Sequence, residues 1–343
     1  MKLQHLAAAA AALLAVGAAS AQSNVTVYGL LDLGLQKSNG DARSATWRNG
    51  PADKAWNLAQ SKGSRLGFRG SEELGGGLSA QFQIEHRFNP DTGAQNNATS
   101  FWSGRAFVQL TSKDFGAVYL GREYAPQYFV AVKTDPFGQD GVGQFSSRAY
   151  ANFQSKGDNG ARTNNTVGYK SPKLGGLSAQ VAVSLGEGST SRETGFNVEY
   201  ASGPLYVAGA YARQDQGAVG TASNSGDGST LVLLAAHYDF GVIKPVVQYS
   251  RSELGPTGNL KNDFWLVGAT APLGAAVLKA GYARFDPSGA NNLQQKIAVG
   301  VDYFLSKRTK LYADLAVSKQ KGTISGGNYG DYRAFAVGYQ HNF

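Results

Sequence analysis

The residues best placed to do chemistry in this sequence are arginines that recur on the polar faces of short extended segments. In the stretch 63–71, Arg65 and Arg69 share one face and Leu66 and Phe68 share the other. Guanidinium groups are permanently charged and present a planar fork of donors to carboxylates and phosphates. The same alternation gives three more arginines to this polar face: Arg87, Arg105 and Arg162. Their pattern predicts a basic surface that attracts anions.

Acidic residues accompany the arginines in two places. Asp32 and Glu85 lie on the polar faces of their own segments, and we expect them to pair with some of the arginines. Asp135 and Asp140 lie in the segment 124–160. Three lysines also lie on the polar faces of their segments and are expected to add a general positive electrostatic potential: Lys244, Lys279 and Lys296.

The sequence contains no catalytic constellation. Its four histidines are far apart, and none has the spacing of a metal-ligand set. The run Gly75–Gly77 predicts a turn and not a phosphate-binding loop, because neither Lys-Ser/Thr nor a helix follows it. We therefore predict neither a metal nor a cofactor.

Alternation with a period of two runs along nearly the whole chain and predicts an all-β fold. It gives about 16 strands, joined alternately by short turns and by long polar loops. A soluble sandwich would not alternate its connections so regularly, and a soluble barrel of this size would enclose a cavity that needs filling. An antiparallel transmembrane β-barrel, with its apolar face toward lipid, fits the pattern best.

The segment 124–160 departs from this alternation. A structureless stretch of this length is uncommon in a compact domain and is usually functional where it occurs. We expect it to fold into the interior of the barrel.

Composition limits the possible compartments and partners. Residues 1–21 have Lys2, an apolar run and Ala19-Ser20-Ala21, which indicates a signal peptide cleaved before Gln22 and leaves 22–343 as one barrel domain. The chain has no cysteine, and its formal charge is +8. The signal peptide contains one lysine and no acid, so the mature charge is +7. Export and the absence of a basic run argue against nucleic acid as a partner.

At this point the sequence resembles the general, trimeric porins of Gram-negative bacteria, of the betaproteobacterial type, over its whole length. The stretches that carry the resemblance are 27–32, 64–75, 115–122, the Asp135-Pro136-Phe137-Gly138 element, 162–172 and the terminal Phe343. The resemblance implies a 16-stranded barrel with its long third loop folded into the lumen, and a homotrimer. It also implies that Phe343 is read by the outer-membrane assembly machinery.

The resemblance adds Arg122 to the basic surface at the pore constriction. Counting from Val118 and Leu120 points Arg122 outward, so this assignment requires a bulge or a strand end. Related porins carry Pro-Glu-Phe-Gly where this chain has Pro136-Phe137-Gly138. The acidity of the loop is therefore assigned to Asp135 and Asp140.

These observations favour a passive channel for ions and small hydrophilic solutes, with a mild preference for anions. Small anionic or neutral solutes, outer-membrane lipid and lipopolysaccharide are the expected partners. One alternative is a porin selective for sugars or organic acids, for which Tyr28, Tyr119 and Tyr312 are candidate contacts. Two others are a plugged structural or adhesive barrel and an outer-membrane enzyme. The enzyme requires a nucleophile beside a histidine, and His237 is the mid-strand candidate.

Overall fold

A computed structural model describes residues 24–39, 54–150, 160–187, 192–215, 228–254, 260–288, 293–320, 323–324, 327–328 and 331–343. The predicted signal peptide lies outside the described residues. Among those described, no helix is both long and apolar enough to cross a membrane.

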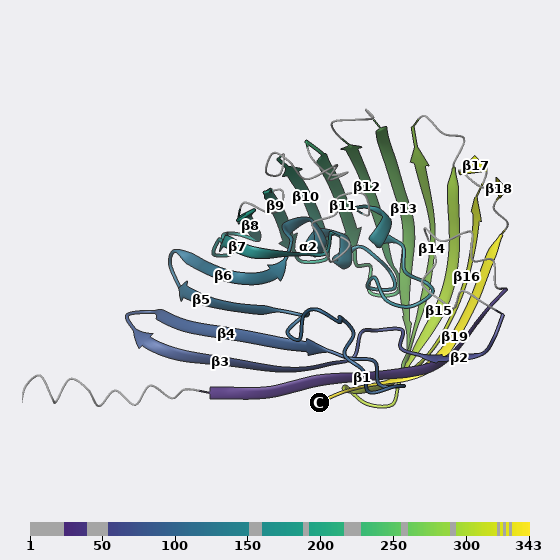
Figure 1. Ribbon diagram of the computed structural model, residues 1–343, viewed down its shortest axis with the longest axis horizontal. Coiled ribbons are helices and arrows are strands. Elements are labelled where there is room, and N and C mark those ends of the chain that lie inside the picture. Colours follow the sequence, from purple (N-terminus) through teal and green to yellow (C-terminus); the bar gives the residue numbers. More distant parts are fainter. Residues whose placement is uncertain are drawn as a thin grey trace, which may run out of the picture.

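The described chain is almost entirely β-structure (Figure 1). The first strands are β1 (Asn24–Ser38), β2 (Asn57–Ala59), β3 (Arg65–Gly75), β4 (Leu78–Arg87), β5 (Ala106–Ser112), β6 (Gly116–Tyr124), β7 (Arg162–Lys170) and β8 (Leu177–Ser184). The next are β9 (Glu193–Ser202), β10 (Leu205–Gln214), β11 (Thr230–Tyr238), β12 (Lys244–Leu254), β13 (Leu260–Leu273) and β14 (Ala276–Pro287). The last are β15 (Gln294–Phe304), β16 (Thr309–Gln320), β17 (Thr323–Ile324), β18 (Gly327–Asn328) and β19 (Tyr332–Asn342).

The wall is a closed antiparallel barrel. Consecutive strands pair along the sheet, and β1 closes it by pairing with β3 through its first half and with β19 through its second. Without the three-residue β2, the described wall has 16 strands, which confirms the predicted number. Closure satisfies every edge, as lipid requires of a spanning sheet.

Alternation along the strands separates lipid-facing from lumenal side chains. In β1, Leu31 and Leu35 are exposed on the outer face, whereas Asp32 and Gln36 are buried on the inner one. Strands β10 and β11 depart from this rule because both of their faces are apolar. The lumenal residues of these two strands are Tyr206, Ala208, Ala210, Ala212, Leu231, Leu233 and Ala235. An interior element therefore covers this part of the wall.

That element is the loop between β6 and β7, which runs along the inside of the barrel (Figure 1). Although the sequence predicted a structureless segment, it begins with the helix α2 (Pro126–Lys133) and contains the 3-10 turn η3 (Ser146–Arg148). Pro126 stands at the first helical position, where its missing N–H costs nothing. The helix packs against β8 to β11.

Loop residues and the lumenal wall share one hydrophobic core. Val130, Phe137 and Phe145 are buried from the loop side against strands between β10 and β19. Hydrogen bonds fix the loop to the same wall: Asn197 donates to Pro126 O (2.8 Å), Ser146 to Gln248 Oε1 (2.7 Å) and Ser250 to Ala149 O (2.8 Å). The open part of the lumen is therefore bounded by the loop and by the opposite wall, β1 and β3 to β7.

Candidate functional site

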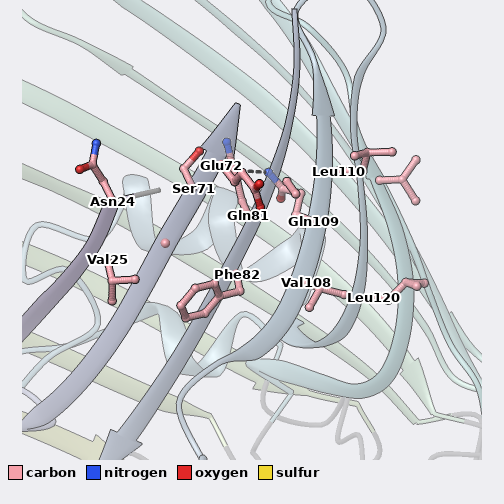
Figure 2. A pocket seen from close by; sticks show the side chains of 13 residues that line it. Asn24, Val25, Ser71, Glu72, Gln81, Phe82, Val108, Gln109, Leu110 and Leu120 are labelled. Carbon is pink, nitrogen blue, oxygen red and sulfur yellow. Dashed lines mark hydrogen bonds between the residues drawn. The ribbon is translucent and has the colours of Figure 1, made fainter. Parts of the chain in front are cut away.

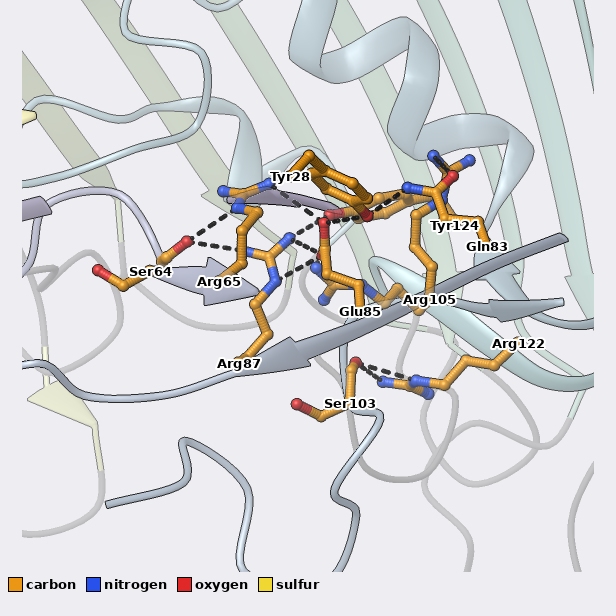
Figure 3. A network of polar contacts seen from close by, with 12 residues as sticks. Tyr28, Ser64, Arg65, Gln83, Glu85, Arg87, Ser103, Arg105, Arg122 and Tyr124 are labelled. Carbon is orange, nitrogen blue, oxygen red and sulfur yellow. Dashed lines mark hydrogen bonds and ion pairs between the residues drawn. The ribbon is translucent and has the colours of Figure 1, made fainter. Parts of the chain in front are cut away.

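The wall opposite the loop carries a network of charged side chains centred on Glu85 (Figure 3). Arg87 donates from Nε to Glu85 Oε1 over 2.8 Å, and Arg65 Nη1 lies 3.9 Å from Oε2. Tyr28 donates its hydroxyl to Oε2 over 3.1 Å. Adjacent strands hold these side chains together, because Arg65 is the register partner of Arg87 in the β3–β4 pair. This confirms the expected pairing of Glu85 with arginines.

A second ion pair continues the network toward β6. Arg105 donates from Nε to Glu123 Oε1 (2.8 Å) and from Nη1 to Gln83 Oε1 (2.9 Å). Lys170 Nζ lies 3.3 Å from the other carboxylate oxygen of Glu123. The sequence analysis missed Glu123, which is fully buried. Alternation along the strand places Glu123 on the same face as Tyr119, and this could have identified it as a lumenal residue.

Tyr124 joins this network to the loop. Its hydroxyl accepts from Arg87 Nη2 (2.9 Å) and Arg162 Nη2 (2.6 Å), and the Arg162 guanidinium lies over its ring at 4.2 Å. The ring stacks on Tyr128 of α2 with centroids 4.2 Å apart. The basic surface and the loop therefore meet at one rigid aromatic contact.

The network has an excess of positive charge. Five cationic side chains surround two carboxylates, those of Glu85 and Glu123: Arg65, Arg87, Arg105, Arg162 and Lys170. Fixed charge acts most strongly where a narrow passage has low-dielectric walls, because little water screens it there.

Arg69 lies on the lumenal face but outside this network. Its guanidinium carbon is 5.4 Å from the centroid of the Tyr28 ring, and it forms no ion pair with a described residue. Arg69 is four residues beyond Arg65 along β3, toward the short turn at Gly75–Gly77. It therefore lies roughly 13 Å from the level of Arg65.

Arg122 is not on the basic surface, and that prediction was wrong. Arg122 pairs with Ala106, so it shares the outer face with Leu120, as Figure 3 indicates by its separation from the other arginines. Its Nε donates to Ser103 O over 3.0 Å and its Nη1 to Asn164 Oδ1 over 2.5 Å. A register shift does occur here, but its extra residue lies in β7, so it leaves the alternation of β6 unchanged.

Asp135 organises the loop from within and does not face the lumen, contrary to expectation. Its carboxylate accepts three backbone N–H groups, from Phe137 (2.9 Å), Phe145 (2.8 Å) and Ser146 (2.8 Å). Burial raises the pKa of this carboxyl, and the three hydrogen bonds partly oppose that shift. Asp135 therefore closes the loop on itself and contributes little field to the passage.

The other two predicted aspartates line a cavity of about 200 Å³ between the loop tip and the wall. Asp140 forms an ion pair with Lys62 (2.7 Å). Asp32 accepts from Tyr312 (2.8 Å) and from the backbone of Ser61 (2.9 Å), so its expected pairing with an arginine was wrong. Gly141 N also donates to Ser61 O over 2.9 Å, which ties the loop tip to the wall.

The C-terminal Phe343 seals the barrel where β1 meets β19. It exchanges two backbone hydrogen bonds with Gly29, of 3.0 and 3.1 Å. A Cβ at Gly29 would lie 2.2 Å from the Phe343 ring. The sequence alone could not indicate this contact.

The geometry suits electrostatic selection of solutes. Within the described ranges, no group of three histidine, cysteine or acidic residues could hold a metal ion. Taken together, the closed wall, the loop packed against its inner face and the lumenal arginines define a transmembrane barrel with a charged interior.

Comparisons with known proteins agree with this architecture. A family model described as Gram-negative porin matches residues 7–323. Outer membrane porin protein 32 of Delftia acidovorans is 35% identical, over 91% of this chain and 89% of its own length. An outer membrane porin protein of Bordetella pertussis is 29% identical, over 97% of this chain and 98% of its own length. A solved anion-selective porin from Comamonas acidovorans has a TM-score of 0.80 at 31% identity, over 94% of this chain and all of that one.

The chain belongs to the Gram-negative porin family. It is an outer-membrane β-barrel whose strands cross the membrane many times.

Proposed function

We propose that this porin is a passive diffusion channel with a mild preference for anions, and that it carries out no chemical step. The observation that carries the proposal is the arginine network of β3 to β7, which places five cations against two carboxylates on the wall opposite the loop. The solved relative from Comamonas acidovorans, which is described as anion-selective, supports the same direction of charge preference. Small anionic and neutral solutes are the proposed cargo.

The loop is proposed to narrow the lumen without plugging it. It packs along the wall between β8 and β19, while the arginines stand on the opposite wall. On this proposal Arg65, Arg87, Arg105 and Arg162 form one side of the constriction. The loop with Asp140 forms the other side.

We further propose a homotrimer assembled through the outer face of β1 and β3 to β6. This face has an apolar groove of about 750 Å³, lined by Val25, Phe82, Val108, Leu110, Val118 and Leu120 (Figure 2). Arg122 and Asn164 are outward-facing polar residues beside it, and lipid is a poor environment for a charged side chain. Lipid and lipopolysaccharide cover the rest of the outer surface, and the assembly machinery reads Phe343.

The channel proposal is tested with refolded protein in a planar bilayer under a KCl gradient. We expect conductance steps in groups of three and a reversal potential that favours anions. The double variant Arg65→Ala/Arg162→Ala should weaken the anion preference. Arg333→Ala, which removes a charge from the outer face of β19, is the matched control and should leave the preference unchanged.

The possible results distinguish the parts of the proposal. A protein that inserts without conductance would be a plugged barrel. Conducting steps whose selectivity is the same in the double variant and in native protein would retain the pore and reject the arginine assignment.

A further inference from the structure

Arg69 lies on the same wall as the ion-paired arginines but nearer to the short turns, and it differs from them in its contacts. Arg65, Arg87 and Arg105 each have a carboxylate partner, whereas Arg69 forms no ion pair with a described residue. Its guanidinium is exposed to the lumen and contacts the ring of Tyr28. Its fork of donors is therefore available to a diffusing carboxylate.

A cavity of about 280 Å³ adjoins this guanidinium. Thr26, Gln81, Gln83 and Phe107 line it together with Arg69. Thr26 and Gln83 are the register partners of Arg69 on the two neighbouring strands, so the sheet fixes their side chains at its sides. The cavity is thus part of the wall and not a product of a loop.

Hydrogen bonds to neighbouring side chains hold the two amide side chains of the cavity, Gln81 and Gln83, in place. Gln83 donates to the Tyr28 hydroxyl (2.5 Å) and accepts from Arg105 (2.9 Å). Gln81 accepts from Gln109 (3.0 Å), and among the described residues its own amide nitrogen makes one hydrogen bond, to Ser79 (3.3 Å). Because an amide nitrogen has two donors, Gln81 retains one for a ligand.

An aromatic ring completes the cavity and limits the shape of its ligand. Phe107 packs edge-to-face on Tyr119 with centroids 6.2 Å apart, which fixes its ring on the lumenal side. A ligand whose carboxylate reaches Arg69 would place its other end beside this ring. The cavity therefore favours a carboxylate joined to a flat apolar body over a small inorganic anion.

We propose that Arg69, Gln81 and Phe107 form a binding subsite for aromatic carboxylates, on the short-turn side of the arginine network. This inference deepens the proposed channel function and rests on it. The subsite holds such solutes briefly as they leave the constriction, and so gives the pore a preference that net charge alone does not supply.

The test uses refolded full-length protein in a planar bilayer with chloride as the carrier and benzoate as the probe. Added benzoate should lower the chloride current in a saturable way. Arg69→Gln should raise the half-blocking concentration about tenfold, the size expected for one charge-assisted hydrogen-bonded contact. Phe107→Leu should raise it for benzoate and leave the weaker block by acetate unchanged.

Lys244→Gln is the matched control. It removes one lumenal charge near the same rim, on β12, which is not part of the cavity. We expect it to change the half-blocking concentration less than twofold. Chloride conductance of every variant shows that the barrel has folded and that the channel function holds.

Each result decides the proposal. A tenfold weakening by Arg69→Gln with no such effect of Lys244→Gln supports the subsite. Equal effects of the two substitutions would reduce it to a general effect of lumenal charge. If the native channel conducts chloride but benzoate and acetate block it equally, the aromatic part is wrong. If neither native protein nor any variant prefers chloride over its counter-ion, the proposed anion-selective channel is rejected, and the subsite that rests on it is rejected as well.

Discussion

Arg105, immediately before β5, and Glu123, near the end of β6, form a two-bonded ion pair although the carboxylate is fully buried, with one bond of 2.8 Å from Nε to Oε1. Lys170 approaches the same carboxylate from β7. Glu123 therefore neutralises part of the basic wall and holds Arg105 against it. Desolvated ion pairs of this kind fix geometry more than they add stability.

Glu123→Gln should increase anion preference and reduce stability together. It frees the charges of Arg105 and Lys170 toward the lumen, so we expect the anion-to-cation permeability ratio to rise on the order of twofold. Loss of one partner from a buried pair should cost about 3 kcal/mol. A KCl-gradient reversal potential and a thermal melt measure the two effects. Glu253→Gln, in an exposed pair with Lys261 on the outer face, is the control, and an equal shift there would contradict the prediction.

Replacing Arg148 by an apolar residue should stabilise the protein. Arg148 lies in η3, its Nε and Nη2 have no hydrogen-bond partner among the described residues, and burial lowers its pKa to about 9. Its charged form is therefore penalised in the folded state. We expect Arg148→Met to raise stability by about 1–3 kcal/mol at pH 7, measured by thermal melting in detergent.

The pH dependence of that gain follows from the direction of the shift. The folded-state pKa of Arg148 lies below its unfolded value, so the cost of burying the charge is full below pH 9. It decreases as the pH rises through about 9. The difference between Arg148→Met and native protein should accordingly be smaller at pH 10.5 than at pH 7. A constant difference would mean that the gain comes from packing alone.

Asp135→Ala should loosen the internal loop without unfolding the wall. It leaves the backbone N–H groups of Phe137, Phe145 and Ser146 without their shared acceptor, at a cost of about 1–3 kcal/mol for each group that stays buried. We expect single-channel records with larger open-state noise and an unchanged barrel circular-dichroism spectrum. Asp140→Ala, which removes one partly exposed ion pair, should have the smaller effect.

Gly29→Ala should impair closure of the barrel. Its new Cβ would meet the Phe343 ring at 2.2 Å and the carbonyl of Arg65 at 2.7 Å, and the backbone contact cannot move aside. We expect a lower refolding yield, measured as the fraction of folded band on an unheated gel. Gly209→Ala is the control, because its nearest atom is 3.4 Å away on the Leu234 side chain. Equal yields for the two variants would reject the steric argument.

The sequence alone determined the barrel, because period-two alternation and the rhythm of short and long connections are local properties of a strand. It also placed Arg65, Arg87, Arg105 and Glu85 on one lumenal surface, since a strand fixes which face a side chain takes. It also predicted that the segment 124–160 folds inside the barrel, but not which strands, β8 to β11, the helix of that segment covers.

Only the tertiary structure decided which lumenal groups meet. Alternation within β6 pointed Arg122 outward and the family resemblance pointed it inward; the structure decides for outward, because the extra residue of the bulge belongs to β7. Asp135 turned inward to cap three N–H groups because a loop must satisfy its own backbone when it is buried. Such partners come from distant parts of the chain, and the alternation of apolar and polar residues along a single strand carries no information about them.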